Sequence, residues 1–340
     1  MKGQKINRKK AIQPVSTTNN FPLHTPNQRF RLKEGYVIGV VTGLLLAVLA
    51  FKLIPTLTVK IRGSADNILT NINKPTPTPD AQALAQTITQ KVLPNEVRLG
   101  VSYGETVKKL VDVGAIDIQK FLQLYEGRGG LSDKEKKLLE EGSNEEIVVT
   151  QQNSGLILNL LWPLGIANKT RVLSDGPMGT EYKNEVGNFA STGGWSVGKV
   201  DGGKLFNKYE ILPLTQEQEA TVKELAENIY RPCCGNSTYF PDCNHGAAML
   251  AFLELAVVQG MPKDEIYKKA LDLNAYWFPQ TYTELAMYFQ TEKNTTWENV
   301  DPKEVLGDSY SSGQGYRAIN EQLAAKGMIP QVKGGGGCGV

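Results

Sequence analysis

Three of the four cysteines and one of the two histidines lie in one short stretch, YRPCCGNSTYFPDCNHG, at residues 230–246. The candidate ligands in it are Cys233, Cys234, Cys243 and His245. Thiolate and imidazole groups bind zinc or copper in preference to hard cations. The stretch therefore predicts a site for a soft or borderline metal ion, although it contains no C-x2-C pair. Cys338 is a further candidate ligand, because the four glycines before it form a flexible arm.

The same residues allow two other interpretations. In one, two loop cysteines form a reactive disulfide, and Cys338 on its arm is the resolving or delivering thiol. In the other, the four cysteines form two structural disulfides, for example between Cys233 or Cys234 and Cys243, and His245 only caps its helix. Among functional roles the composition favours metal binding or handling, and the three interpretations remain open at this level.

The stretch is predicted to be a loop between two helices. Residues 215–230 have the pattern of a helix, and Pro232 helps to end it. Residues 246–260 are apolar nearly all round and too short to cross a membrane, which is typical of a central core helix. Glu254 is the lone acid of that helix. We expect it to pair with a buried base or with His245, or to lie at an exposed edge.

Cys243 and His245 stand at the start of the second helix, where Asp242 and Asn244 are the predicted N-caps. A thiol in this position lies at the positive end of the helix dipole and ionises more easily. Arg231, beside the first two cysteines, could also lower the pKa of a neighbouring thiol.

Helix signals dominate the rest of the chain and predict a mainly α fold. Capping-box spacing occurs in three pairs: Ser102 with Glu105, Ser132 with Glu135, and Thr215 with Gln218. Asp301 and Pro302 predict another helix start, and helix stops are expected at Gly114, Gly142 and Gly260. Strand patterns are scarce, and the best candidates are residues 145–150 and 208–214.

The body is predicted to contain a helical region at 81–204, a helical Cys/His-motif domain at 205–330 and a flexible Gly-Cys tail at 331–340. The first region ends in a long Gly-rich loop, residues 174–206. Phe189 and Trp195 in this loop indicate that it packs against the body.

The N-terminal part predicts a membrane anchor. Residues 1–34 form a basic cytoplasmic tail, with eight Lys or Arg and no acid before Glu34. Residues 35–58 are predicted to be one transmembrane signal anchor, since 35–51 carry no charge and the basic residues stay on the cytoplasmic side. A Pro/Thr linker at 59–80 then leads to an extracytoplasmic body. This orientation rule already explains the basic tail, so no nucleic-acid partner is expected.

Three glycines in the predicted anchor, Gly35, Gly39 and Gly43, recur every four residues. Such spacing lets two membrane helices approach closely, and it would permit a homodimer.

The strings YRPCC and FPDCNHG, followed by an apolar helix and GMPKDEIYKKAL, resemble an uncharacterised group of membrane-anchored prokaryotic proteins. The resemblance implies an anchor and a cysteine-motif domain, and it implies no activity. A looser similarity is to extracytoplasmic thiol proteins of cytochrome c maturation, which use a C-x-x-C motif that this chain lacks. The chain also has no HExxH, GxSxG, Walker or dinucleotide-binding motif, so no catalytic activity is assigned from the sequence.

Overall fold

The computed structural model describes residues 77–329. The predicted basic tail, the anchor, nearly all of the linker and Cys338 lie outside these residues. Within residues 77–329, no helix is both long enough and apolar enough to cross a membrane.

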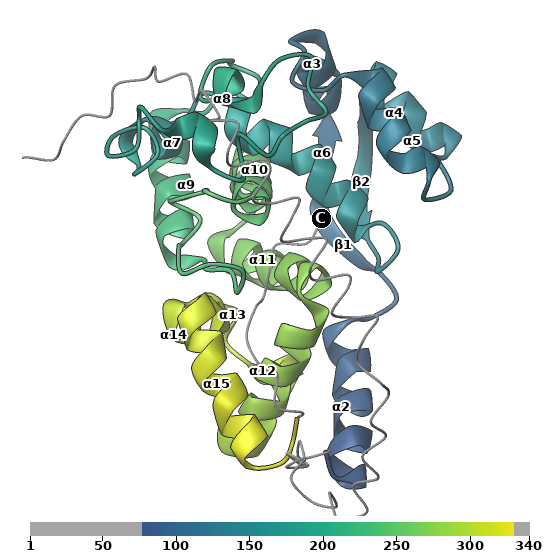
Figure 1. The fold of residues 1–340 in the computed structure, drawn as a ribbon, viewed down its shortest axis with the longest axis vertical. Helices are drawn as coiled ribbons and strands as arrows, with labels where there is room; N and C mark the ends of the chain where they lie inside the picture. The colour runs from purple at the N-terminus through teal and green to yellow at the C-terminus, as the bar shows by residue number, and fades with distance from the viewer. Residues whose placement is uncertain (1–76, 330–340) are drawn as a thin grey trace, which may run out of the picture. The chain divides into compact units, whose positions relative to one another are not determined.

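The described residues are mainly helical, as predicted (Figure 1). In chain order the elements are α2 (Pro79–Val92), β1 (Val97–Gly104), α3 (Thr106–Asp112), α4 (Ile118–Glu126), α5 (Asp133–Glu141), β2 (Ser143–Val149), α6 (Ser154–Ala167), α7 (Arg171–Asp175), η1 (Val186–Asn188), α8 (Gly202–Leu205), α9 (Gln216–Asn228), α10 (Asn244–Val258), α11 (Lys263–Trp277), α12 (Pro279–Glu292), η2 (Trp297–Asn299), α13 (Pro302–Leu306), α14 (Asp308–Ser311) and α15 (Gly313–Ala325).

Two helices that are apolar on every side form the centre of the core. All but two residues of α6 and all but one of α10 are buried, and the two helices lie side by side (Figure 1). Their backbones approach closely because α6 has a glycine at the contact: a Cβ added to Gly165 would lie 1.8 Å from the carbonyl oxygen of Ala247. The predicted central core helix at 246–260 is thus confirmed, and α6 holds its N-terminal turn in place.

A two-stranded antiparallel sheet flanks this core, and only one of its two strands was predicted. β2 confirms the expected strand at 145–150. Its partner β1 was not predicted, because Ser102 and Glu105 have the spacing of a helix cap. Ser102 instead lies within β1, where Leu99, Val101 and Tyr103 alternate toward the core. The predicted strand at 208–214 is wrong, since the only pairing there is an isolated bridge between Tyr209 and Asn168.

The structure confirms the helix boundaries predicted at Ser132, Thr215 and Asp301 and at three glycines. Ser132 and Thr215 form complete capping boxes, and the Asp301 side chain accepts a hydrogen bond from the backbone N–H of Lys303 at the start of α13. Gly114, Gly142 and Gly260 follow helices with φ between 76° and 79°. This left-handed conformation is the one that favours glycine after a helix C-terminus.

The Gly-rich loop packs against the body, as its aromatic residues predict. Trp195 is buried, lies 4.9 Å from Trp162 of α6 between ring centroids, and donates its indole N–H to the carbonyl of Ala115. Phe189 packs edge-on against Phe240, and the backbone N–H of Ser191 bonds to the carbonyl of Asp242. The loop therefore supports the C-terminal part of the cysteine stretch.

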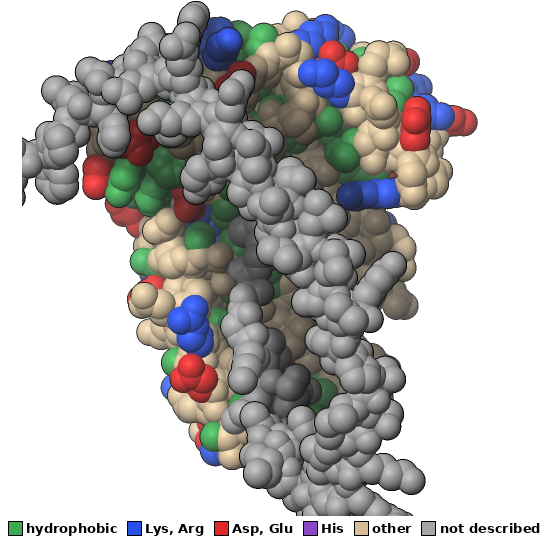
Figure 2. Space-filling view, viewed as in Figure 1, with side chains coloured by type: hydrophobic (Ala, Val, Ile, Leu, Met, Phe, Trp, Pro, Cys, Tyr) green, Lys and Arg blue, Asp and Glu red, His purple; other side chains and the backbone are tan. Residues whose placement is uncertain are grey.

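Charged side chains of both signs are interspersed over α4 and α5 on the visible face (Figure 2). Several of them form ion pairs, among them Lys134 with Glu145 and Lys137 with Glu141. These pairs are exposed, so each contributes about 0–1 kcal/mol to stability. This part of the surface presents no patch of a single sign.

Candidate metal centre

The cysteine stretch folds back on the end of α9 and returns to the start of α10. Tyr230 and Ser237 form an isolated antiparallel bridge, and the backbone N–H of Thr238 donates to the carbonyl of Ile229 at 2.8 Å. Tyr239 continues the fold by bonding to the carbonyl of Ala226 in α9. This turn brings the two ends of the stretch together, although ten residues separate Cys233 from Cys243.

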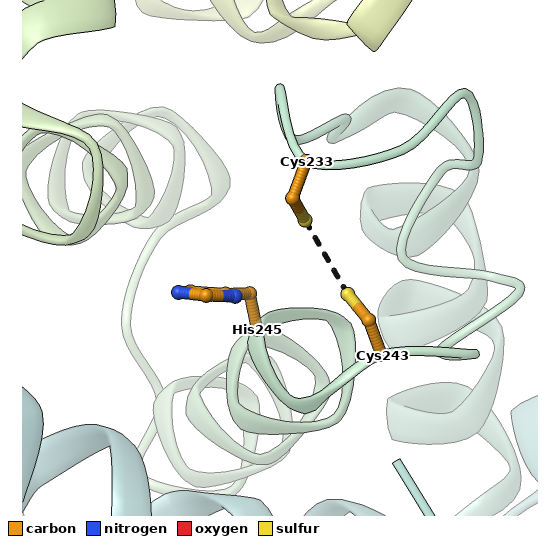
Figure 3. A group of neighbouring side chains, drawn as sticks. All are labelled: Cys233, Cys243 and His245. Atoms are coloured by element: carbon orange, nitrogen blue, oxygen red, sulfur yellow. Dashed lines mark hydrogen bonds between the residues drawn. The ribbon is translucent and has the colours of Figure 1, made fainter. Parts of the chain in front are cut away.

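Cys233, Cys243 and His245 lie close enough to hold a metal ion. The Cys233 and Cys243 sulfurs are 3.5 Å apart, and one ligand atom from each of the three residues lies within 4.8 Å of the others. Two thiolates on one tetrahedral zinc ion would be separated by about 3.8 Å, given a Zn–S bond of about 2.3 Å. Figure 3 shows the two thiols pointing toward each other, while the imidazole lies beside them and extends away from the sulfurs.

A second group shares one of these residues. Cys234, Asp242 and Cys243 also place their ligand atoms within 4.8 Å of one another, and the Cys234 sulfur is 3.8 Å from Asp242 Oδ1. The four predicted loop ligands are thus gathered in two overlapping groups, with Cys243 in both. Cys338, the fifth predicted ligand, lies outside the described residues.

The three described cysteines are not joined by disulfides. A disulfide needs a sulfur–sulfur distance of about 2.05 Å. The 3.5 Å between Cys233 and Cys243 leaves two thiols in contact. The predicted structural bridges are therefore absent among residues 77–329, and the same pair remains near enough to form one after a small movement.

Cys243 is itself the N-cap of α10, where Asp242 and Asn244 were expected. Its sulfur accepts a hydrogen bond from the backbone N–H of Gly246 at 3.4 Å and another from Arg231 Nε at 3.0 Å. The Asn244 side chain bonds only to the neighbouring N–H of His245. Two N–H donors and the N-terminus of a 15-residue helix stabilise negative charge on the Cys243 sulfur.

Arg231 organises the whole loop. Its guanidinium is fully buried, and all five of its N–H groups have acceptors. These acceptors are Cys243 Sγ at 3.0 Å, the carbonyls of Asn236, Ser237 and Phe240 at 3.1, 2.8 and 2.9 Å, and Asp242 Oδ1. The sequence suggested Arg231 as a neighbour of a thiol but not as the centre of the loop. The sequence does contain a signal for this role: an arginine stands just before the cysteine loop, and an aspartate stands near the end of that loop.

A glycine makes room for this guanidinium. A Cβ on Gly246 would lie 2.5 Å from Arg231 Cζ. Real Cβ atoms do not approach other atoms that closely, so the absence of a side chain in the first turn of α10 lets Arg231 lie against the helix N-terminus.

The pKa values of the thiols follow from their crowding. Hydrogen bonds with Cys234 and Cys243, then burial, raise the pKa of Cys233. A hydrogen bond with Cys233 lowers the pKa of Cys234, but a hydrogen bond with Cys243 and burial together raise it by more, to about 11. Burial lowers the pKa of Arg231, but the surrounding thiols and Asp242 raise it by more, so the guanidinium stays charged. A cation that replaces the proton of a second sulfur would therefore favour its ionised form.

His245 has an unused nitrogen. Its Nδ1 is buried and has no hydrogen-bond partner among the described residues. The ring packs against Phe278, 4.4 Å away between centroids, and lies 5.9 Å from Trp277. A buried polar atom without a partner is costly, and an ion or a ligand that binds it relieves the cost.

Glu254 differs from all three expectations, because it is fully buried and its partner is Asn168. Asn168 donates from Nδ2 to Glu254 Oε2 at 2.9 Å and to the carbonyl of Leu212 at 3.0 Å. Burial raises the pKa of Glu254 well above its ordinary value of 4.5, and the Asn168 hydrogen bond only partly opposes this.

We expect this acid to make stability fall as pH rises. Above pH 4.5 ionisation of Glu254 stabilises the unfolded chain, while the folded protein keeps the carboxyl protonated. The free energy of unfolding therefore falls by about 1.4 kcal/mol per pH unit until the pH reaches the raised pKa. Glu254→Gln should remove this slope and stabilise the protein at pH 7, as urea unfolding at several pH values would measure.

The comparison is made above pH 6, because Asp272, whose pKa burial raises to about 6, adds a slope of the same sign below that. Glu210→Gln, at an exposed position, is the matched control and should keep the slope. Equal slopes in wild type and Glu254→Gln would show that Glu254 is ionised in the folded protein.

The chain matches no protein-family model, no curated protein and no solved structure.

Proposed function

We propose that the protein binds or handles a soft or borderline metal ion, zinc or copper, through Cys233, Cys243 and His245. One observation carries the proposal: two sulfurs 3.5 Å apart and an imidazole nitrogen lie within 4.8 Å of one another. This donor set suits zinc and copper by its chemistry.

Charge balance supports the proposal. A buried site is stable only when its charges are nearly compensated. Asp242 compensates Arg231, to which it is hydrogen-bonded. The thiolates of Cys233 and Cys243 would then compensate a divalent ion, and Arg231 Nε would continue to donate a hydrogen bond to the Cys243 sulfur without touching the ion.

Three ligands leave one coordination position open. Structural zinc sites are closed by four protein ligands, whereas an open position admits water or an incoming ligand. Cys233 is only partly buried, so an ion held here would be reachable from outside. An open, partly accessible site suits transfer of the ion better than a purely structural role. Whether Cys338 completes the site, and whether the body is anchored outside a membrane, stay predictions from the sequence.

The test is the mass of the intact full chain, measured under native and denaturing conditions after growth with zinc or copper. We expect a mass excess of one ion that denaturation removes, with the cysteines reduced. Cys243→Ser and Cys233→Ser should lose the ion. Cys234→Ser is the matched control, since Cys234 lies outside the first group, and it should retain the ion. Wild-type protein that carries no ion after growth with either metal would refute the proposal.

The geometry of the same two thiols favours a second candidate, thiol–disulfide exchange. Closing the 3.5 Å gap between Cys233 and Cys243 would form a disulfide, while an external disulfide takes up two electrons and two protons and becomes two thiols. Equilibration with oxidised and reduced glutathione, followed by alkylation and mass measurement, tests this role. A reversible loss of two hydrogens that requires both cysteines would support it.

A further inference from the structure

A second site lies on the other side of His245. A cavity of about 160 Å³ is lined by Arg128, Ser154, Gly155, Leu158, Asn159, Asn244, His245, Tyr276 and Trp277. Its walls come from the turn after α4, the first turns of α6 and α10, and the end of α11. The imidazole extends away from the sulfurs, as Figure 3 shows, and it is the one residue that the cavity shares with the first metal group.

Two of the residues that line the cavity each contain a buried polar atom without a hydrogen-bond partner among the described residues. Asn159 is 3% exposed, and its Oδ1 is unpaired among the described residues, while its Nδ2 donates to the hydroxyl of Tyr125 at 2.9 Å. His245 is 7% exposed, and its Nδ1 also has no hydrogen-bond partner among the described residues. Asn159 stands in a helix that is otherwise apolar nearly all round. A buried amide with an open acceptor is costly in such a helix unless a donor group fills the cavity.

The charge of the lining selects the ligand further. Arg128 supplies a guanidinium, and none of the described residues that line the cavity is acidic. Arg128 is exposed and forms no described ion pair, so its charge is available at the cavity. A guanidinium pairs best with a carboxylate or a phosphate, and the small volume favours a carboxylate. The opposite end of the ligand would need an O–H or N–H donor for Asn159 Oδ1.

We propose that this cavity binds a small carboxylate that carries a hydroxyl or amino group. Arg128 binds the carboxylate, Asn159 Oδ1 accepts the donor, and the rings of Tyr276 and Trp277 form the side walls. The indole N–H of Trp277 is already donated to the carbonyl of Ser154, which keeps that ring in place. The cavity shares His245 with the proposed metal centre, but Arg128 and Asn159, which recognise the ligand, are not in that metal group, so the proposal goes beyond the metal function and does not rest on it.

Isothermal titration calorimetry of the full chain with glycolate tests the proposal. The titration is made with a chelator present, so that metal occupancy does not enter. Glycolate has both recognised groups, acetate lacks the donor, and ethylene glycol lacks the charge. We expect saturable binding of glycolate and binding about tenfold weaker for each of the other two, since each loses one hydrogen-bonding group.

Arg128→Gln should weaken glycolate binding about tenfold, the effect of one charge-assisted hydrogen bond. Arg317→Gln makes the same change at another exposed arginine, on α15 away from the cavity, and should leave the affinity unchanged. The absence of saturable heat with glycolate, or equal weakening in both variants, would mean that the cavity holds only water and would overturn the proposal. A failure here leaves the metal measurement unaffected.

Discussion

Arg231→Leu is expected to destabilise the protein by about 3–5 kcal/mol, the range found when one partner of a buried ion pair is removed. The substitution leaves Asp242 without its cation and three loop carbonyls without their donors. Leucine fills part of the volume but supplies no hydrogen bond. Urea unfolding of the variant and the wild type at one pH measures the difference.

Arg171→Leu is the control, because Arg171 forms an exposed ion pair with Asp175 at 2.9 Å. Removing an exposed pair should cost less than about 1 kcal/mol. Arg231→Lys should also be clearly destabilising, since an ammonium has three donors where the loop uses five. If Arg231→Leu costs no more than the control, the guanidinium does not hold the loop.

The space beside Arg231 gives a second measurement of the same contact. Gly246→Ala places a Cβ 2.5 Å from Arg231 Cζ and should cost about 1–3 kcal/mol by overpacking. Gly235→Ala, in the same loop, meets no atom within 4 Å and should be nearly neutral. Equal stability of these two variants would show that Arg231 is free to move from the N-terminus of α10.

Gly165→Ala is expected to cost at least about 3 kcal/mol, at the upper end for overpacked cores. Its Cβ would lie 1.8 Å from the carbonyl oxygen of Ala247. To reach an ordinary contact distance, the two atoms would have to move further apart by about 1.5 Å or more. Since α6 and α10 are both buried on all sides, neither can move without disturbing other contacts.

The control is Gly155→Ala in the first turn of the same helix, where an added Cβ meets nothing within 4 Å. Alanine there should be neutral or stabilising by up to about 1 kcal/mol, because it favours the helix. Thermal unfolding and urea unfolding of the pair measure the difference. If Gly165→Ala is as stable as Gly155→Ala, α6 can shift along α10, and the close approach does not fix the position of Cys243 and His245.

Local signals in the sequence were sufficient for several elements. The capping boxes at Ser132 and Thr215 and the start of α13 at Asp301 depend on residues three or fewer positions apart. The burial of α10 followed from its composition, because a helix that is apolar on every side must be covered. The crowding of three cysteines and His245 into residues 230–246 also identified the candidate centre from local spacing.

Only the tertiary structure decided which partners these residues have. Ser102 belongs to a strand because β2, some forty residues later, pairs with it, and this pairing overrides the local capping pattern. Arg231 became the centre of the loop because the chain folds back on α9 and α10, which brings five acceptors to one guanidinium. Asn159 lines the same cavity as His245 although 86 residues separate them. The sequence by itself thus determined which groups are available and where helices begin. Long-range packing decided what each group contacts, because contact energies depend on neighbours that local patterns do not contain.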